Sequence, residues 1–233
     1  MPRVLYLTGQ NNHDWRRTSV ICAGLLRDRL GYDVVIDHEA EKALCGDLSG
    51  YDLIFLDYNG PTWNDQARAA FEAAIAGGCG LVSLHASNNA HTGWVAFERM
   101  VVPLWRETGN HGDFHEYEVT IDDPDHPITR GMAAFRTWDE LYHAQQNPQD
   151  APVHVLASAY SDPATRGSGK VEPMATVTQY GEGRIFHLLL GHVWTGNPAS
   201  HNGNSTIALE SDGFRALLLR GSEWATTGTV SAT

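Results

Sequence analysis

Two histidines of this chain stand directly after short apolar runs that read as buried strands. His85 follows Gly80–Leu84, and His192 comes just after Arg184–Leu190. In open α/β sheets, ligands bind just beyond the carboxyl ends of the strands. An imidazole at that place can act as an acid, a base or a metal ligand near neutral pH. His85 and His192 are therefore candidate catalytic residues and candidate metal ligands.

Other predicted strand ends carry side chains that suit a polar ligand. They are Asn12, His13 and Trp15 after the first strand, Asn59 after the third, and Asn88 close to His85. If the strands run parallel, all these ends open onto one crevice. Amides can bond sugar hydroxyls, and an indole can stack on the apolar face of a sugar ring. We expect these residues to bind substrate, although each one alone could be a cap, loop or core residue.

The segment Trp138–His143 gathers two carboxylates, a phenol and an imidazole. Read as a strand, its alternation puts Glu140 and Tyr142 on one face and the residues between them on the other. If that face looks into the crevice, Glu140 is a candidate general acid or base and Tyr142 a hydrogen-bond donor to substrate. The alternative is a solvated edge strand.

The polar segment Asn110–His115 contains two histidines four residues apart, His111 and His115. On a helix this spacing would put both imidazoles on one face for a metal, but the glycine between them favours a loop. With His85 and His192 joining from elsewhere, His115 could still complete a site for a divalent transition metal such as zinc. His115 is also a candidate catalytic base.

The elements that position these residues follow an α/β pattern. Short apolar runs alternate with helical patterns in the first half, which is typical of βαβ units on a parallel sheet. The predicted strands are Val4–Thr8, Asp33–Asp37, Leu53–Asp57, Gly80–Leu84, Glu116–Asp122, Val153–Tyr160, Ala175–Tyr180 and Arg184–Leu190. The predicted helices are Arg16–Leu30, Asn64–Ala76, Trp94–Val101 and Gly213–Trp224, the last capped by Ser211. We expect one domain over residues 1–233.

Composition narrows the classes of partner. With 16 basic and 28 acidic residues, the net charge of −12 disfavours nucleic acid and anionic membrane surfaces. Three cysteines without a CxxC pair fit reduced thiols in a cytoplasmic protein. No apolar run approaches the ~18 residues of a membrane span, and no leader precedes the first strand. A small-molecule ligand is expected, and a homo-oligomer is compatible with the sequence.

Five segments in order resemble the ThuA-like, or trehalose-utilisation, family. They are Asn12–Trp15, Gly78–Ala86, His126–Gly131, Asp139–Tyr142 and Gly183–His192. The resemblance implies the fold of class I glutamine amidotransferases, a flavodoxin-like sandwich with a mostly parallel central sheet. True amidotransferases carry a cysteine where this chain has His85, so glutamine hydrolysis is not expected.

The resemblance further implies a role in bacterial sugar catabolism, on trehalose-related or 3-keto-glycoside intermediates. One hypothesis is an enzyme in which Glu140 or His115 removes a proton next to a keto group, while His85, His192 or a bound metal stabilises the enolate. The alternative is a non-catalytic carbohydrate-binding or regulatory module. A metal-dependent hydrolase of another substrate class is a third hypothesis.

Overall fold

A nine-stranded sheet forms the centre of the protein. The computed structural model describes residues 1–195 and 205–231. The strands are β1 Arg3–Gly9, β2 Asp33–Asp37, β3 Leu53–Tyr58, β4 Gly80–Leu84, β5 Asn110–Ile121, β6 Phe135–His143, β7 His154–Tyr160, β8 Val171–Tyr180 and β9 Gly183–Leu188. Their order across the sheet is β2-β1-β3-β4-β9-β8-β7-β5-β6.

The sheet is mixed rather than mostly parallel. Strands β2, β1, β3, β4 and β9 run parallel to one another, whereas β8, β7, β5 and β6 join the sheet by antiparallel pairing. Parallel pairing needs a crossover connection of about a dozen residues or more. Only Gly181 and Glu182 join β8 to β9, which allows a hairpin but no crossover. The expectation of a mostly parallel sheet thus describes one half of it.

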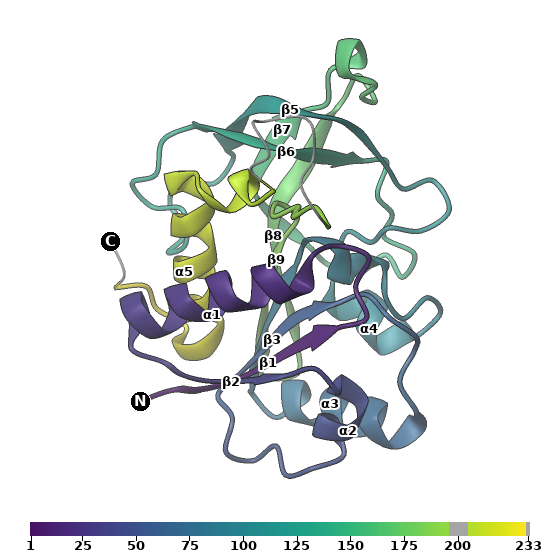
Figure 1. The fold of residues 1–233 in the computed structure, drawn as a ribbon, viewed down its shortest axis with the longest axis vertical. Coiled ribbons are helices and arrows are strands. Elements are labelled where there is room, and N and C mark those ends of the chain that lie inside the picture. Colours follow the sequence, from purple (N-terminus) through teal and green to yellow (C-terminus); the bar gives the residue numbers. More distant parts are fainter. Residues whose placement is uncertain (196–204, 232–233) are drawn as a thin grey trace.

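Helices cover both faces of the parallel half, with α1 and α5 on one side and α2, α3 and α4 on the other (Figure 1). Their bounds are α1 Trp15–Leu30, α2 Ala40–Leu44, α3 Asp65–Ala76, α4 Val95–Met100 and α5 Asp212–Thr227. The side chain of Ser211 accepts a hydrogen bond from the backbone N–H of Phe214, which confirms the predicted cap. The short helix α2 was not predicted. None of the helices in the described ranges is long and apolar enough to cross a membrane.

Alternate residues of the parallel strands pack into two separate cores. Tyr6 and Phe55 stack at 4.4 Å between ring centres and face α1 and α5. Their neighbours Leu7 and Leu56 belong to the cluster that contains α2 and α3. Strands buried on both faces need such continuous apolar runs. In the parallel strands, buried polar residues such as Thr8, Asp57 and Ser83 lie near the carboxyl ends.

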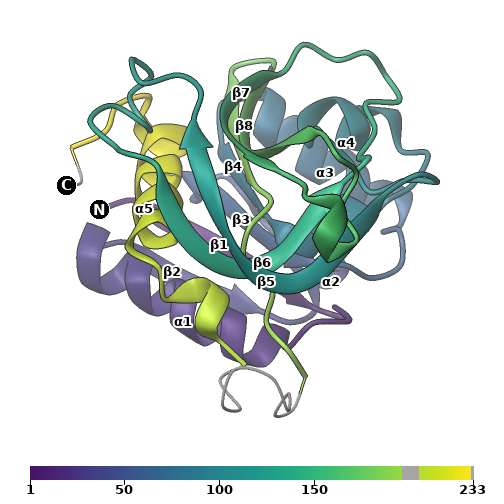
Figure 2. The same ribbon diagram turned by 90° about the horizontal axis from the view of Figure 1, so that it is seen from above.

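The antiparallel pair β5 and β6 forms a curved ribbon that arches across the carboxyl ends of the parallel strands (Figure 2). The predicted loop Asn110–His115 is in fact the first part of β5, because ladder bonds to β6 hold it extended. Its register shifts between His111 and Phe114. A Cβ on Gly112 would lie 2.7 Å from the carbonyl oxygen of Thr165, so this β-bulge needs glycine.

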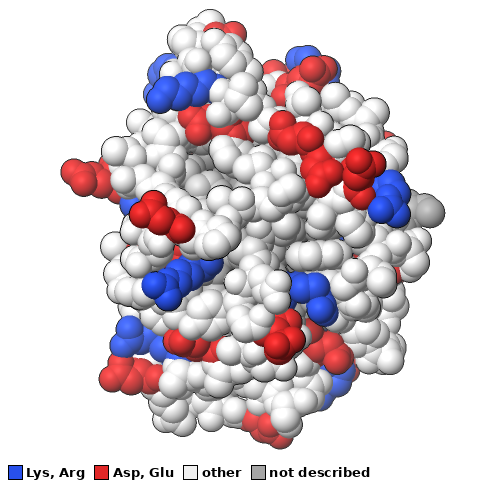
Figure 3. Space-filling model, turned by 180° about the vertical axis from the view of Figure 1, so that it is seen from behind, with Lys and Arg blue, Asp and Glu red and all other residues white. Residues whose placement is uncertain are grey.

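Charged side chains are mixed on the face turned away from the viewer in Figure 1. There Lys and Arg lie among Asp and Glu around a largely uncharged centre (Figure 3). Within the described part of the chain, this face shows no continuous basic patch of the kind that binds a polyanion.

Candidate active site

A polar cavity of about 360 Å³ lies where the ends of β1, β3, β4 and β9 meet the β5–β6 ribbon. Its walls are Asn12, His13, Asn59, Ala86, Asn89, Trp105, His111, Glu140, Tyr142, His192, Val193, Trp194 and Thr195. The position agrees with the rule that ligands bind at the carboxyl edge of the parallel strands.

His85 forms a sharp elbow at the end of β4. Its φ is +43°, a strained value for a residue with a Cβ, and its side chain is only 3% exposed. Nδ1 donates to the carbonyl oxygen of Leu189 at 2.7 Å, which leaves Nε2 as the acceptor. The hydroxyl of Tyr142 donates to Nε2 at 2.8 Å, and the two rings stack at 25°. Burial, with nearby His13 and His192, lowers the pKa of His85 well below its ordinary value.

His13 reaches the site from the loop between β1 and α1. The side-chain oxygen of Asn11 accepts from both the backbone N–H and Nδ1 of His13, each at 3.0 Å. The amide nitrogen of Asn11 in turn donates to Asp57 at 3.1 Å, which fixes the orientation of the amide. Nδ1 of His13 therefore carries a proton and Nε2 a lone pair. Burial, helped by His192 and His111, lowers the pKa of His13 to about 3, so the ring is neutral at pH 7.

A buried carboxyl group, that of Asp139, holds the segment that carries His192. Asp139 accepts hydrogen bonds from the backbone N–H of Gly191 at 2.6 Å, of His192 at 3.2 Å and of Glu140 at 2.8 Å. Burial raises its pKa to about 7 although these bonds favour the ionised form. Asp139 thus ties β6 to the end of β9.

Glu140 brings a carboxylate against two imidazoles at the cavity wall. Its Oε2 lies 3.1 Å from Nδ1 of His192 and 3.5 Å from Nδ1 of His111. The contact with His192 is close enough for an ion pair but is not aligned as a hydrogen bond. The carboxylate is nearly buried, so its interaction with a proton on either ring is weakly screened. This group can pass a proton between carboxylate, imidazole and a bound ligand.

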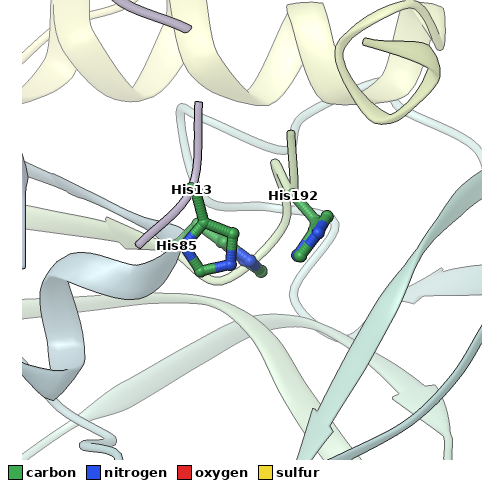
Figure 4. A group of neighbouring side chains, drawn as sticks. All are labelled: His13, His85 and His192. Carbon is green, nitrogen blue, oxygen red and sulfur yellow. The ribbon is translucent and has the colours of Figure 1, made fainter. Parts of the chain in front are cut away.

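Three imidazoles from distant parts of the chain converge at the inner end of the cavity (Figure 4). One nitrogen from each of His13, His85 and His192 lies within 4.8 Å of the other two. The ring centres of His13 and His192 are 4.4 Å apart, and those of His13 and His85 are 4.9 Å apart. Imidazole nitrogens so placed can hold a transition metal.

The structure brings most of the predicted site residues together. Asn12 and Asn59 line the cavity and are joined by a hydrogen bond of 2.9 Å. Glu140 and Tyr142 share the cavity-facing side of β6, as the alternation predicts. His192 lies between them and the end of β9.

Three of the predicted site residues, Trp15, Asn88 and His115, lie outside this group. Trp15 packs edge-on against His38 at 4.9 Å. Asn88 is fully buried and donates to Pro103 and Gln145.

His115 also lies outside the cluster. It is on β5, where Nδ1 contacts the carbonyl oxygen of Asp113 at 2.6 Å and Nε2 contacts Thr165 at 3.4 Å. His13 lies beside His85 and His192 instead. The spacing of His111 and His115 pointed to a site, but of these two residues it is His111 that lines the cavity. Trp105 and Trp194 line the cavity as well.

Comparison with known proteins identifies the family and the fold. The ThuA family, described as trehalose utilisation, matches residues 3–225. A ThuA-like protein from Parabacteroides merdae is 32% identical, with a TM-score of 0.84 over 100% of this chain and 93% of that one. A ThuA-like protein from Bacteroides uniformis is 19% identical, with a TM-score of 0.72 over 100% and 94%.

The glutaminase domain of a Trypanosoma brucei CTPS is 13% identical, with a TM-score of 0.53 over 99% of this chain and 95% of that one, a likeness of fold alone. No curated protein matches the chain.

Proposed function

This chain belongs to the ThuA family, and on that premise we propose that it is an enzyme of sugar catabolism that moves a proton next to the carbonyl group of a keto-sugar. The substrate class is a trehalose-related 3-keto-glycoside. The family description as trehalose utilisation supports the sugar, and the cavity supports the chemistry. A cytoplasmic site of action is part of the proposal and is supported by three unpaired cysteines.

The contact of Glu140 with His192 and His111 carries this proposal. A carboxylate beside two imidazoles has both a proton acceptor and a route by which the proton leaves. All three side chains face the cavity, where a ligand would meet them. The hydrogen bonds of Asp139 hold the backbone of Glu140 and His192 in place, so their geometry is built before a ligand binds.

The proposed step is a balanced proton transfer. A carbonyl group acidifies the C–H bond on the adjacent carbon. Glu140 takes that proton, the C–H electron pair forms a carbon–carbon double bond, and the carbonyl π pair moves onto oxygen. An N–H group of His192 stabilises the enolate oxygen. Return of a proton to the same carbon, from either face, gives exchange or isomerisation. Loss of a leaving group from the carbon next to it gives elimination.

The remaining walls suit a sugar. The hydrogen bond between Asn12 and Asn59 holds two amides at the cavity edge, where they can bond hydroxyl groups. Trp105 and Trp194 supply flat apolar surfaces for the face of a pyranose ring. Polar edges with aromatic walls are what a carbohydrate pocket requires.

Glutamine hydrolysis is not proposed, because the elbow after β4 carries His85 where amidotransferases carry a cysteine. The structure describes all three cysteines, and none of them lines the cavity. Burial raises the pKa of Cys79 to about 12, so this thiol is protonated at neutral pH.

The test is a proton NMR time course with trehalose, its 3-keto derivative and simple 3-keto-glucosides. The proposal expects conversion of the keto-sugars and not of trehalose. Binding of these sugars without conversion would favour the non-catalytic carbohydrate-binding module. If none of these sugars binds and none is converted, the proposed substrate class is wrong.

A further inference from the structure

We infer that His13, His85 and His192 bind one divalent transition-metal ion of the zinc type, with an open coordination position that faces the cavity. The role of this ion in polarising a sugar carbonyl rests on the proposed function, whereas the binding itself does not. The three ligands come from the β1–α1 loop, the end of β4 and the segment after β9 (Figure 4). Only the folded chain brings them together.

The hydrogen bonds behind His85 and His13 turn an acceptor nitrogen of each ring toward the cluster. Nδ1–H of His85 donates to the carbonyl oxygen of Leu189, and Nδ1–H of His13 donates to Asn11. Each neutral ring then presents Nε2 as an acceptor. Acceptors that face one another cannot bond among themselves, and a cation satisfies all of them at once.

Among the described residues, the hydroxyl of Tyr142 donates to Nε2 of His85 at 2.8 Å. An ion on Nε2 takes the place of this hydrogen bond. Tyr142 lines the cavity, so its hydroxyl can then bond to water or to a substrate there. His192 places Nδ1 beside Glu140, so its other nitrogen is also left for the ion.

The outer partners are those that metal-bound histidines usually have. Such rings commonly donate their second N–H to a carbonyl, an amide or a carboxylate, which orients the ring and raises its basicity. Here Leu189 stands behind His85, Asn11 behind His13, and the Glu140 carboxylate beside His192. Glu140 also supplies negative charge that offsets the charge of the ion.

The three imidazole nitrogens can reach one zinc ion if the rings move slightly closer together. The ligand nitrogens lie within 4.8 Å of one another, whereas tetrahedral zinc with bonds of 2.0–2.1 Å holds nitrogens about 3.3 Å apart. Inward shifts of about 1 Å or less suffice, and His13 lies on a loop that can make them. Three nitrogen ligands with a free fourth position are the pattern of catalytic rather than structural zinc. His13 and His192 line the cavity, so that position is open to substrate.

Metal binding is tested on the chelator-stripped, untagged full chain by titration with Zn²⁺ against a chromophoric chelator, without sugar. We expect one equivalent of Zn²⁺ bound with a dissociation constant below 1 μM. His13→Ala should weaken it by about 30-fold or more, because one of three ligands is lost. His115→Ala, which removes an imidazole outside the cluster, should bind as the native chain does.

Because His13 is partly exposed, its variant is expected to fold, and circular dichroism checks this. Co²⁺ gives a second measurement, since tetrahedral coordination gives intense visible bands that His13→Ala should weaken. Absence of tight Zn²⁺ binding, or equal binding by native chain and His13→Ala, would overturn the inference. Metal-free protein that converts keto-sugars at the full rate would leave the acid–base proposal standing and remove the role of the ion.

Discussion

His85 and His91 lie six residues apart and are alike in backbone conformation and burial. Both adopt positive φ, at +43° and +55°, and both are nearly buried, at 3% and 2% exposure. Burial lowers the pKa of each. Their surroundings nevertheless differ completely, because one belongs to a polar site and the other to an apolar core.

His91 is packed among aromatic rings, and neither of its nitrogens has a hydrogen-bond partner among residues 1–195 and 205–231. Its neighbours, by ring-centre distance, are Trp63 at 4.2 Å, Phe97 at 4.8 Å, Trp94 at 5.3 Å and Tyr58 at 5.7 Å. His85 instead has both nitrogens in contact with oxygen and two further imidazoles beside it. Convergent polar partners, and not burial or a shifted pKa, therefore distinguish a site histidine from a core histidine.

The largest predicted effect is on catalysis. Glu140→Gln keeps the shape of the side chain but removes the base, so turnover of a 3-keto-glucoside should fall about 100-fold or more. Glu116→Gln is the matched control, since Glu116 pairs with Arg136 on the exposed part of the β5–β6 ribbon. Steady-state rates measure both. Equal losses in the two variants would mean that charge on the ribbon, and not a placed base, matters.

The second effect tests the polar network around His192. Asp139→Ala leaves three backbone N–H groups without their acceptor, at Gly191, His192 and Glu140. The free energy of unfolding should fall by about 3 kcal/mol, measured by urea denaturation. Ser158→Ala, which removes a hydrogen bond to Asp122 outside the site, should cost about 1 kcal/mol. A loss for Asp139→Ala no larger than that would show that Asp139 is not needed to hold His192.

The third effect concerns the core histidine and is a pH dependence. Burial, with Arg106 and Arg68 nearby, lowers the pKa of His91 from 6.5 to about 3. Below pH 6.5 the unfolded chain takes up a proton that folded His91 does not, so stability falls as the pH drops toward 3.

His91→Phe removes this difference. Between pH 7.5 and pH 5 the variant should lose about 2 kcal/mol less stability than the native chain, as followed by urea denaturation at each pH. Parallel profiles for His91→Phe and the native chain would show that His91 is not held neutral.

The smallest predicted effect is that of Tyr142→Phe. The phenol donates a single hydrogen bond to His85, so its loss should slow turnover by less than about 10-fold and change stability by about 1 kcal/mol. Zn²⁺ affinity should stay within a few-fold of the native value. A loss of Zn²⁺ binding as large as that of His13→Ala would mean that Tyr142 belongs to the ligand set.

Much of the parallel half could be predicted from the sequence, because strands buried on both faces are continuous apolar runs and their ends must be polar. The antiparallel half was harder. The segment Asn110–His115 reads as a loop, since only its pairing with β6 makes it extended. The ThuA family was correctly identified from the order of its motifs.

The sequence identified the site residues mainly through their positions at the ends of predicted strands. His85 and His192 stand at such places, and the alternation along β6 points to Glu140. His115 and His111 are equivalent in the sequence, and the bulge in β5 decides that His111 faces the cavity. Asp139 alternates away from the cavity on β6, so its task of binding the Gly191 backbone could not be read from the chain.

Proton NMR in D₂O, with a 3-keto-glucoside and either native protein or Glu140→Gln, tests the proposed chemistry most directly. Exchange, isomerisation and elimination all remove the signal of a proton on a carbon next to the carbonyl. We predict rapid loss of that signal with the native chain and, with Glu140→Gln, loss slower by about 100-fold or more. Equal loss in both samples, or no loss beyond that seen without protein, would contradict proton transfer by Glu140.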